Sequence, residues 1–342
     1  MGRGITKREG KKISLSGLIV RMALVLSILA VATIAVIVMT TSTANSLMSI
    51  KKKDLPNIPS NVLPPYSATS FVSADDQTQL SGWFFKTDDP ISTIIVVHDT
   101  QSNRLPFNVS MVQMIEDFLN MHYNVFLFDL RNSGESSGTI CGYGYLEWQD
   151  VLGAVSIVRQ ISVTTNVILF GMGTGCTSSL LAYANLPPEG AGENTLSQYS
   201  QEIKNLGFDR SYVIGMILDS PAKESDDYIK PEVVQREPLG FLTKYSVPYA
   251  IRVSSGGTNI SLAAEIARLP IPVLILYGGH DTFVGADKID QIIKERNRLN
   301  SSITRSVMVS GSGYLEEYSI NKNLYIDTVN DFLNSFYMLD DK

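Results

Sequence analysis

One stretch of the chain, residues 166–181, constrains the fold more than any other. A short apolar run of strand character meets three glycines at alternate positions, Gly171, Gly173 and Gly175, and passes directly into a helical pattern. Such a turn either cradles a phosphate group or presents a nucleophilic side chain. The phosphate-binding version ends in Gly-Lys-Ser/Thr, and no lysine follows Gly175 in this stretch. The spacing therefore favours the nucleophile turn, Gly-x-Ser-x-Gly, with Gly173 at the position of the serine.

The N-terminal segment has the pattern of a membrane anchor. Residues 1–14 are polar and basic, and a charge-free run from Met22 to Met39 would reach about 27 Å as a helix, close to the hydrocarbon thickness of a bilayer. A buried core helix is disfavoured because nothing polar recurs at helical spacing. A cleaved signal peptide is the stronger alternative, because Ser42-Thr43-Ala44 is an acceptable small-x-small cleavage site. The length of the run favours an uncleaved signal-anchor, single-pass helix.

Charge around this run predicts the orientation of the chain. The basic residues before the run outweigh the three lysines that follow it at a distance, so the N-terminus is expected in the cytoplasm and the main domain outside the cell membrane. We expect a cytoplasmic basic tail at 1–14, a transmembrane helix at 15–41, a stalk containing prolines and lysines at 42–65, and one domain at 66–342. With a net charge of −6, the chain offers no electrostatic surface for a nucleic-acid partner.

The domain begins with an antiparallel hairpin and continues as strands alternating with helices. Continuous apolar strands separated by helical patterns predict a mostly parallel central sheet with helices on both faces. A polar insertion is expected on the surface at 187–205, and a cap over the top edge of the sheet at 222–260. The expected strands are 68–72, 80–85, 92–97, 124–130, 166–170, 212–218, 271–277 and 304–309. The expected helices are 107–121, 146–160, 174–184, 286–297 and 324–337.

Several motifs in this order resemble the α/β-hydrolase superfamily, and more narrowly its bacterial membrane-anchored, serine aminopeptidase-like members. The loop from Asp129 to Gly138 reads Asp-Leu-Arg-Asn-Ser-Gly-Glu-Ser-Ser-Gly and matches the family's Asp-x-Arg-x-x-Gly-x-Ser-x-Gly loop throughout. The strand that ends in His98-Asp99 resembles the family's strand ending in His-Gly. Two further segments, 218–221 and 276–284, match the family's later strand ends. The likeness spans roughly residues 71–333 and implies the α/β-hydrolase fold.

The resemblance also implies a catalytic triad, whose members follow the chain order nucleophile, acid, histidine. The matching positions are Gly173, Asp281 and Tyr314. Glycine has no side chain with which to attack, and a phenol that titrates near pH 10 cannot act as a general base at neutral pH. Only the acid is present, so the triad is degenerate. Asp281 is then expected to accept a hydrogen bond from Tyr314.

The oxyanion-hole positions are altered as well. One donor is the backbone N–H of Thr174, and the other comes from the loop at Asp99 and Thr100, where Asp99 stands in place of the usual glycine. A carboxylate there repels a developing oxyanion. We therefore interpret the chain as a catalytically inactive pseudo-hydrolase that binds a small molecule, peptide or protein in the crevice at the carboxyl ends of the strands. A purely structural protein, with that crevice filled by side chains of 222–260, is a further interpretation.

An active esterase or peptidase with a non-standard nucleophile is the alternative. Thr174 lies one position beyond the turn's centre, where its side chain should aim elsewhere. Cys176 lies in the first turn of the following helix, where the helix dipole lowers a thiol's pKa, although packing between helix and sheet is favoured. Cys141 and Cys176 are expected as free or buried thiols rather than a disulfide. His98 and His280 each precede an aspartate, but their spacing fits no metal motif, so we expect no metal and no cofactor.

Overall fold

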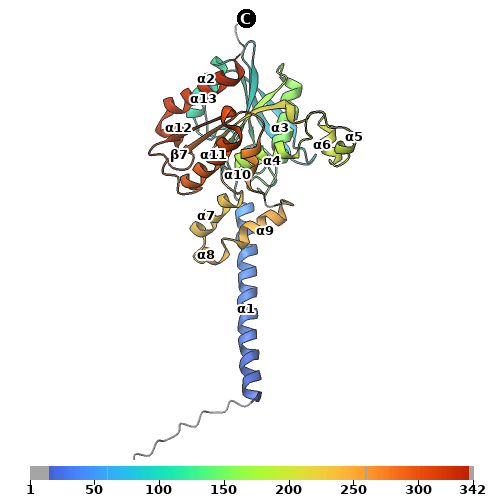
Figure 1. Ribbon diagram of the computed structural model, residues 1–342, viewed down its shortest axis with the longest axis vertical. Coiled ribbons are helices and arrows are strands. Elements are labelled where there is room, and N and C mark those ends of the chain that lie inside the picture. Colours follow the sequence, from blue (N-terminus) through green and yellow to red (C-terminus); the bar gives the residue numbers. More distant parts are fainter. Residues whose placement is uncertain (1–14, 60, 259, 339–342) are drawn as a thin grey trace, which may run out of the picture.

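The computed structural model describes residues 15–59, 61–258 and 260–338, so the expected basic tail at 1–14 lies outside the described residues. A central sheet with helices on both faces stands at one end of a long N-terminal helix (Figure 1). The strands begin and end within a residue or two of the positions expected from the sequence. They are β1 (Tyr66–Val72), β2 (Gln79–Phe85), β3 (Ser92–Val97), β4 (Tyr123–Asp129), β5 (Val167–Met172), β6 (Val213–Asp219), β7 (Val273–Gly278) and β8 (Thr304–Val309).

The strands form one eight-stranded sheet in the order β1-β2-β4-β3-β5-β6-β7-β8. β1 and β2 form the expected antiparallel hairpin, β2 also runs antiparallel to β4, and all the remaining neighbours are parallel. The prediction of a mostly parallel sheet is confirmed. In such a sheet the carboxyl ends of the parallel strands meet at one edge, which is where ligands and catalytic groups lie.

The apolar strands have no solvent face because helices cover both sides. Successive residues of β3 alternate between two cores: Ile94 and Val96 face one, while Ile95 and Val97 face the other. Since side chains alternate along a strand, a strand buried on both faces must be apolar at every position. On the Ile94 side the sheet is covered by α2 (Ser110–Asn120), α12 (Glu317–Ile320) and α13 (Lys322–Tyr337). On the Ile95 side it is covered by α3 (Trp148–Ile161), α4 (Thr174–Asn185), α10 (Leu262–Arg268) and α11 (Ala286–Asn300).

Two insertions interrupt this alternation. The polar segment 187–205 carries the short helices α5 (Glu193–Leu196) and α6 (Gln201–Asn205), followed by a 3-10 turn η1 (Arg210–Tyr212). A second 3-10 turn, η2 (Ser301–Ile303), precedes β8. The segment expected as a cap forms three helices after β6: α7 (Asp226–Arg236), α8 (Gly240–Thr243) and α9 (Ser246–Ser254). Figure 1 shows these three helices beside the domain-proximal end of α1.

The N-terminal helix α1 runs from Leu15 to Met48, past the end expected at residue 41. Within the described part of the chain it is the one helix long and apolar enough to cross a membrane, and its most apolar window has a mean hydropathy of 2.8 and no buried residue. Its last turns are buried instead, because Thr43, Ala44 and Leu47 pack into the domain. Tertiary packing therefore extends the helix beyond the apolar run.

The first residues after α1, within the segment expected as an extended stalk, lie against the domain. The Asn132 side chain donates a hydrogen bond to the Ile50 carbonyl at 2.9 Å, and the Asn103 side chain donates one to the Asp54 carbonyl at 2.9 Å. Its described residues, 49–59 and 61–65, form no helix or strand, yet side chains from the loops of the sheet hold its backbone at Ile50 and Asp54. The domain is thus held close to α1 rather than at the end of a free linker.

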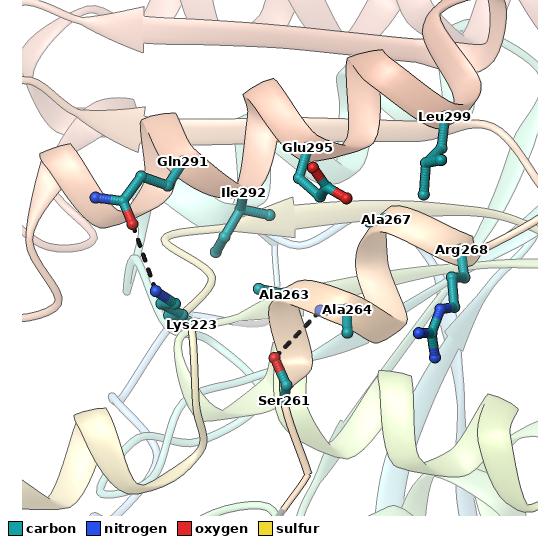
Figure 2. Close-up of a pocket in the computed structure, with 10 residues that line it drawn as sticks. All are labelled: Lys223, Ser261, Ala263, Ala264, Ala267, Arg268, Gln291, Ile292, Glu295 and Leu299. Carbon is teal, nitrogen blue, oxygen red and sulfur yellow. Dashed lines mark hydrogen bonds between the residues drawn. The ribbon is translucent and has the colours of Figure 1, made fainter.

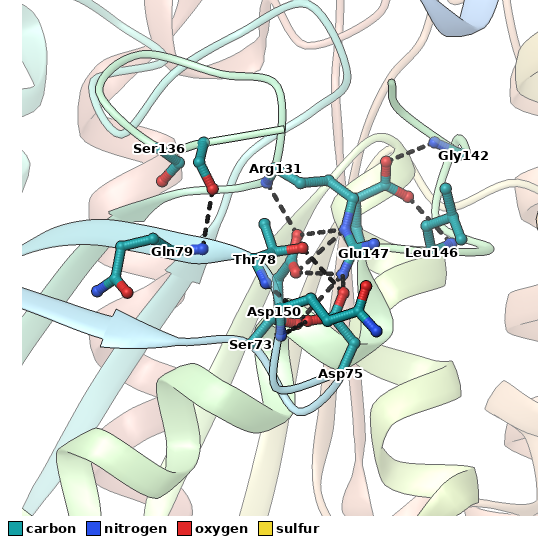
Figure 3. A network of polar contacts seen from close by, with 12 residues as sticks. Ser73, Asp75, Thr78, Gln79, Arg131, Ser136, Gly142, Leu146, Glu147 and Asp150 are labelled. Carbon is teal, nitrogen blue, oxygen red and sulfur yellow. Dashed lines mark hydrogen bonds and ion pairs between the residues drawn. The ribbon is translucent and has the colours of Figure 1, made fainter. Parts of the chain in front are cut away.

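The motif loop 129–138 is held by buried ion pairs. The Arg131 guanidinium contacts Asp150 of α3 at 2.7 Å and Asp75 of the β1–β2 turn at 3.0 Å (Figure 3). Asp129 accepts hydrogen bonds from Arg104 and from the backbone N–H of Glu135. Because buried charges are tolerated only when they are paired, these contacts fix the loop's course beside the carboxyl edge of the sheet. The motif therefore has a structural explanation independent of any chemistry.

Candidate functional site

The turn between β5 and α4 keeps the shape of a nucleophile-presenting elbow. Gly173 has φ +54° and ψ −122°, a conformation that costs an ordinary residue about 1–3 kcal/mol. A Cβ on Gly171 would lie 2.7 Å from the Gly175 carbonyl oxygen, and one on Gly175 would overlap the Val97 carbonyl. The two outer glycines are needed for close backbone approach, and the central one for its left-handed backbone. The sequence spacing thus predicted the bend correctly.

The Asp99 carboxylate lies over the N-terminus of α4. Its Oδ1 accepts a hydrogen bond from the Thr174 backbone N–H at 2.9 Å and another from the Thr174 hydroxyl at 2.8 Å. The Thr174 hydroxyl in turn accepts from the Thr100 backbone N–H at 2.7 Å. The first N–H groups of a helix have no intrahelical acceptor and carry a partial positive charge, so a carboxylate is well placed here. The Thr174 backbone N–H, which the sequence predicted as an oxyanion-hole donor, is thus already hydrogen-bonded to Asp99.

Tyr314 completes this cluster from the opposite side. Its hydroxyl donates a hydrogen bond to Asp99 Oδ2 at 3.1 Å, and its ring packs 4.6 Å from the ring of Phe283, centroid to centroid. Tyr314 lies in the loop after β8, Asp99 after β3 and Thr174 after β5. Three loops that are far apart in sequence therefore meet at one point above the elbow. All three residues were among the site positions predicted from the sequence.

Electrostatics keep the phenol neutral and leave Asp99 titratable near neutral pH. Burial raises the pKa of Asp99 to about 6, and the three hydrogen bonds from Thr174 and Tyr314 oppose that rise. Burial, followed by the charge of Asp99, raises the pKa of Tyr314 well above its usual value. At neutral pH the cluster is therefore a carboxylate with neutral donors around it. A neutral, buried phenol cannot accept a proton from a nucleophile.

The space that a side chain on Gly173 would need is already filled. A Cβ built on Gly173 would overlap the Tyr314 hydroxyl oxygen and lie 2.6 Å from Asp99 Cγ. Although Gly173 carries no side chain, it leaves no extra room at the floor of the crevice, because the Asp99 carboxyl group and the Tyr314 hydroxyl occupy that space.

Asp281 does not bond to Tyr314, contrary to expectation. Its Oδ1 accepts hydrogen bonds from the backbone N–H groups of Phe283 and Val284, at 2.8 and 2.9 Å, and its Oδ2 is buried without a partner. The carboxylate organises its own loop after β7, and Tyr314 turns to Asp99 instead. Burial raises the pKa of Asp281, while these backbone donors lower it. Asp281, at the acid position, therefore makes no hydrogen bond to Tyr314, at the position predicted for histidine.

A pair of buried acids that share a contact with Ser220 was not found from the sequence. Ser220 donates from its hydroxyl to Asp219 and is also 3.2 Å from Glu317 Oε1, while the Tyr325 hydroxyl donates to Asp219 at 2.7 Å. Burial raises the pKa of both Asp219 and Glu317, and their mutual repulsion adds to it for Glu317. Only the strand-end Asp219-Ser220 motif signalled this pair; Glu317, in a short helix, carried no motif.

The alternative nucleophiles and the histidine are committed to structural contacts. The Cys176 thiol donates to the Gly171 and Asp219 carbonyls, and burial raises its pKa well above the usual value. Cys141 and Cys176 are both free and buried, as expected. The His98 ring accepts from the Leu130 N–H through Nε2, so its Nδ1–H donates to the Asp99 carbonyl at 2.7 Å. Among the described residues no group of three His, Cys, Asp or Glu side chains could hold a metal ion.

The cap lies over the cluster. Tyr228 of α7 packs 6.3 Å from Tyr314, ring centroid to ring centroid, and donates a hydrogen bond to the Ser220 carbonyl. Arg236 of α7 donates to the Gln101 side chain at 2.8 Å. The cap thus contacts the loops after β3, β6 and β8 together. In part, this matches the reading in which the segment 222–260 helps to fill the crevice.

One hollow on the surface lies away from this cluster. A groove of about 290 Å³ between α10 and α11 is lined on one side by Ser261 and Ala264 and on the other by Gln291 and Glu295 (Figure 2). Lys223 bridges part of it by a hydrogen bond to Gln291. None of the residues that line this groove belongs to the cluster at the elbow, so the groove is not the predicted crevice.

Comparisons with known proteins agree with this architecture. No protein-family model matches the chain. It is 25% identical over 286 residues to the uncharacterized protein YfhR of Escherichia coli strain K12, covering 79% of this chain and 82% of that one. It is 21% identical over 258 residues to the uncharacterized protein YqkD of Bacillus subtilis strain 168, covering 75% of each.

Solved structures with the same course of chain are esterases and other hydrolases. The esterase Pf2001 of Pyrococcus furiosus superposes with a TM-score of 0.63 at 18% identity, covering 85% of this chain and 99% of that one. The α/β hydrolase GrgF of a Penicillium species gives 0.54 at 15% identity, covering 80% and 99%. The strand order, the elbow after β5 and these likenesses agree: the chain has the α/β-hydrolase fold.

Proposed function

We propose that this chain is a membrane-anchored pseudo-hydrolase, which acts by binding a ligand or partner and not by triad hydrolysis. The observation that carries the proposal is the hydrogen bond from the Thr174 N–H to the Asp99 carboxylate. An esterase must leave this donor free for the developing oxyanion of its substrate. Here the chain's own carboxylate satisfies it, and the Tyr314 hydroxyl fills the space beside it.

The chemistry of the remaining groups supports the same conclusion. Hydrolysis by a triad needs a nucleophile, a base that accepts its proton and a free oxyanion donor. Gly173 supplies no attacking atom, Tyr314 is held neutral, and the Thr174 N–H is already bonded to Asp99. Each of the three requirements fails separately, so restoring one alone should restore no activity. Because ligands of open α/β sheets bind at the carboxyl ends of the strands, the proposed ligand or partner would lie above the Asp99–Tyr314 contact, beside the cap.

The likeness to serine aminopeptidase-like hydrolases gives a direct test. The full chain is exposed to a fluorophosphonate probe and to a chromogenic short-chain ester. The triple variant Gly173→Ser, Asp99→Gly, Tyr314→His serves as the matched positive control, since it rebuilds all three functions in one fold. We expect no labelling of the native chain and measurable labelling and esterase activity of the triple variant. Probe labelling of the native chain at a defined residue would overturn the proposal.

One contact favours a second candidate, an active hydrolase with a non-standard nucleophile. The Thr174 hydroxyl lies 2.8 Å from Asp99, within reach for proton transfer, and the pKa of Asp99 is about 6, suitable for a general base. In this reading Thr174 attacks and Asp99 takes its proton. Probe labelling that disappears in Thr174→Val and persists in Thr177→Val, a buried threonine one turn further along α4, would establish it.

The anchor gives the proposal its location. With α1 in the membrane and the basic tail on the cytoplasmic side, the domain faces the exterior of the cell. The exposed apolar surface of α1 up to Val38 supports the membrane position of this helix, since such a surface is unfavourable in water. Protease added to intact cells should remove the domain and spare a fragment that contains α1. Protection of the domain in intact cells, and its digestion only after lysis, would reverse the topology.

A further inference from the structure

The cap helices α8 and α9 carry large apolar side chains on the outside of the domain. Phe241 is 60% exposed, Tyr245 67% and Tyr249 59%. Single exposed apolar residues are ordinary, but several within one short segment mark a surface that something covers. We refer to this surface as the cap face, which consists of Leu239, Phe241, Leu242, Tyr245, Tyr249 and Val253.

The cap face lies at the depth where α1 would leave a bilayer. The Thr40 hydroxyl of α1 is 2.7 Å from the Ser246 hydroxyl of α9, and Thr40 directly follows the apolar run that ends at Met39. A groove of about 390 Å³ between the two helices is lined by Ile37 of α1 together with Tyr249 of α9. Figure 1 shows α8 and α9 on either side of α1 at this level. The cap face therefore overlaps the last turn of the apolar run.

We propose that the cap face docks into the interfacial layer of the bilayer that α1 crosses, and that a lipid acyl chain fills the groove between α1 and α9. The inference rests on the anchored topology proposed above. It commits to lipid as the occupant because the cap face is continuous with the exposed apolar surface of α1. A protein partner covering the cap face would also have to cover that end of α1.

The chemistry of the cap face suits an interface better than a dry protein core. The Lys244 ammonium lies 4.9 Å from the centroid of the Tyr245 ring, and the Arg252 guanidinium lies 5.5 Å from that of Tyr249. Tyrosine and lysine are enriched at the membrane surface, where the ring enters the acyl boundary and the charge reaches the headgroups. Leucine and phenylalanine beside them supply the apolar area that holds such a surface in lipid.

Docking would orient the whole domain. The cap follows β6, so it lies at the carboxyl edge of the sheet, above the Asp99–Tyr314 cluster. With the cap face in the membrane, this edge faces the bilayer and the opposite edge faces away from it. Val163, which is 82% exposed in the loop before β5, lies at that opposite edge.

A fluorescent label can locate the cap face. The full chain is placed in nanodiscs of phosphatidylcholine and phosphatidylglycerol, with lipids that carry doxyl quenchers at known depths. A polarity-sensitive dye is attached to Phe241→Cys in the cap face, Ile28→Cys in α1 or Val163→Cys at the far edge; both native thiols are buried. We expect lipid quenching at position 241 with a depth of about 5–10 Å below the headgroup boundary. Position 28 should be quenched more deeply and position 163 not at all.

The outcomes separate docking from anchoring. Lipid quenching at position 28 without lipid quenching at position 241 overturns the docking and leaves the anchor intact. This holds even where iodide, a quencher dissolved in the buffer, also fails to reach the label at 241, because the surface is then covered by something other than lipid. No quenching at 28 overturns the anchored topology itself. A second measurement uses the label on Tyr249→Cys in the background Phe241→Asp, Leu242→Asp. These side chains are exposed, so folding should survive, and we expect at least about a twofold loss of lipid quenching; unchanged quenching contradicts the role of the cap face.

Discussion

The carboxylate of Asp99 accepts a hydrogen bond from the backbone N–H of Thr174, the first residue of the helix that follows the elbow. This contact joins the loop after β3 to the start of α4, and the Tyr314 hydroxyl adds a third donor from the loop after β8. A helix N-terminus is a site for anions, and in this chain it holds an internal one. The fold of a hydrolase is thus retained while its anion site is closed from within.

Replacing Gly173 by serine alone should destabilise the chain. The residue would have to adopt φ +54° and its Cβ would meet Asp99 and Tyr314, so we expect a loss of about 2–4 kcal/mol in the free energy of unfolding and no gain of activity. Adding Asp99→Gly and Tyr314→His should recover much of that loss, because both obstructing groups are removed. Urea unfolding of the single and triple variants in detergent micelles measures both effects. Equal stability of the two variants would show that the three positions do not share one space.

Asp99 should make stability depend on pH between about 4 and 6. Its pKa in the folded chain is about 6, above the value near 4 of an unfolded aspartate, so the folded state binds more protons in this window. Stability from this group is therefore greatest below pH 4 and is lost as the pH rises to 6, by roughly 2 kcal/mol.

The variant Asp99→Asn isolates this dependence. Its amide mimics the protonated acid, keeping an oxygen for Thr174 and gaining an N–H for the Tyr314 oxygen. We expect its unfolding free energy to vary less than that of the native chain between pH 4 and 7. Asp88→Asn, at an exposed loop position, is the matched control and should follow the native profile. A variant profile parallel to the native one would contradict the shifted pKa of Asp99.

Asp281 should matter for its own loop and not for Tyr314. Removing its carboxylate in Asp281→Ala deprives the Phe283 and Val284 N–H groups of their acceptor, at a cost of about 1–3 kcal/mol. Asp281→Asn keeps an acceptor oxygen and should remain near native stability. The near-ultraviolet signal of Tyr314, isolated by comparison with Tyr314→Phe, should stay unchanged in both variants. A change in that signal would mean that Asp281 does contact the phenol.

The sequence was sufficient for the fold because the decisive signals are local. Apolar runs such as Ile94–Val97 must be buried on both faces, and the spacing of Gly171 and Gly175 reflects contacts within a single turn. The positions of Asp99, Thr174 and Tyr314 came from the resemblance to α/β-hydrolase motifs, and parallel strands bring together the carboxyl ends that carry these residues. These features depend on neighbours in the chain and on topology.

The pairing within the site could not be predicted in the same way. Whether Tyr314 turns to Asp99 or to Asp281 depends on the course of three loops and on side-chain rotamers, which no local pattern encodes. The extension of α1 to Met48 likewise involves distant residues, since the Met48 carbonyl accepts a hydrogen bond from the Cys141 backbone N–H, more than 90 residues further along the chain. Glu317 could not be predicted as a site residue because only tertiary packing buries it close to Asp219. The helices and strands could therefore be predicted from the sequence, whereas the long-range contacts between them could not.

The two thiols should be inert in the folded chain. Both are buried, burial raises the pKa of each, and Cys176 donates to two backbone carbonyls, so neither presents a thiolate to solvent. We expect maleimide to label neither thiol in the native state at neutral pH and to label both after unfolding in urea, as read by intact-mass spectrometry. Val163→Cys, at an exposed position, is the control that should react at once. Rapid native labelling of Cys176 would instead indicate an accessible nucleophile beside the elbow, and would move the balance from the pseudo-hydrolase to an active enzyme.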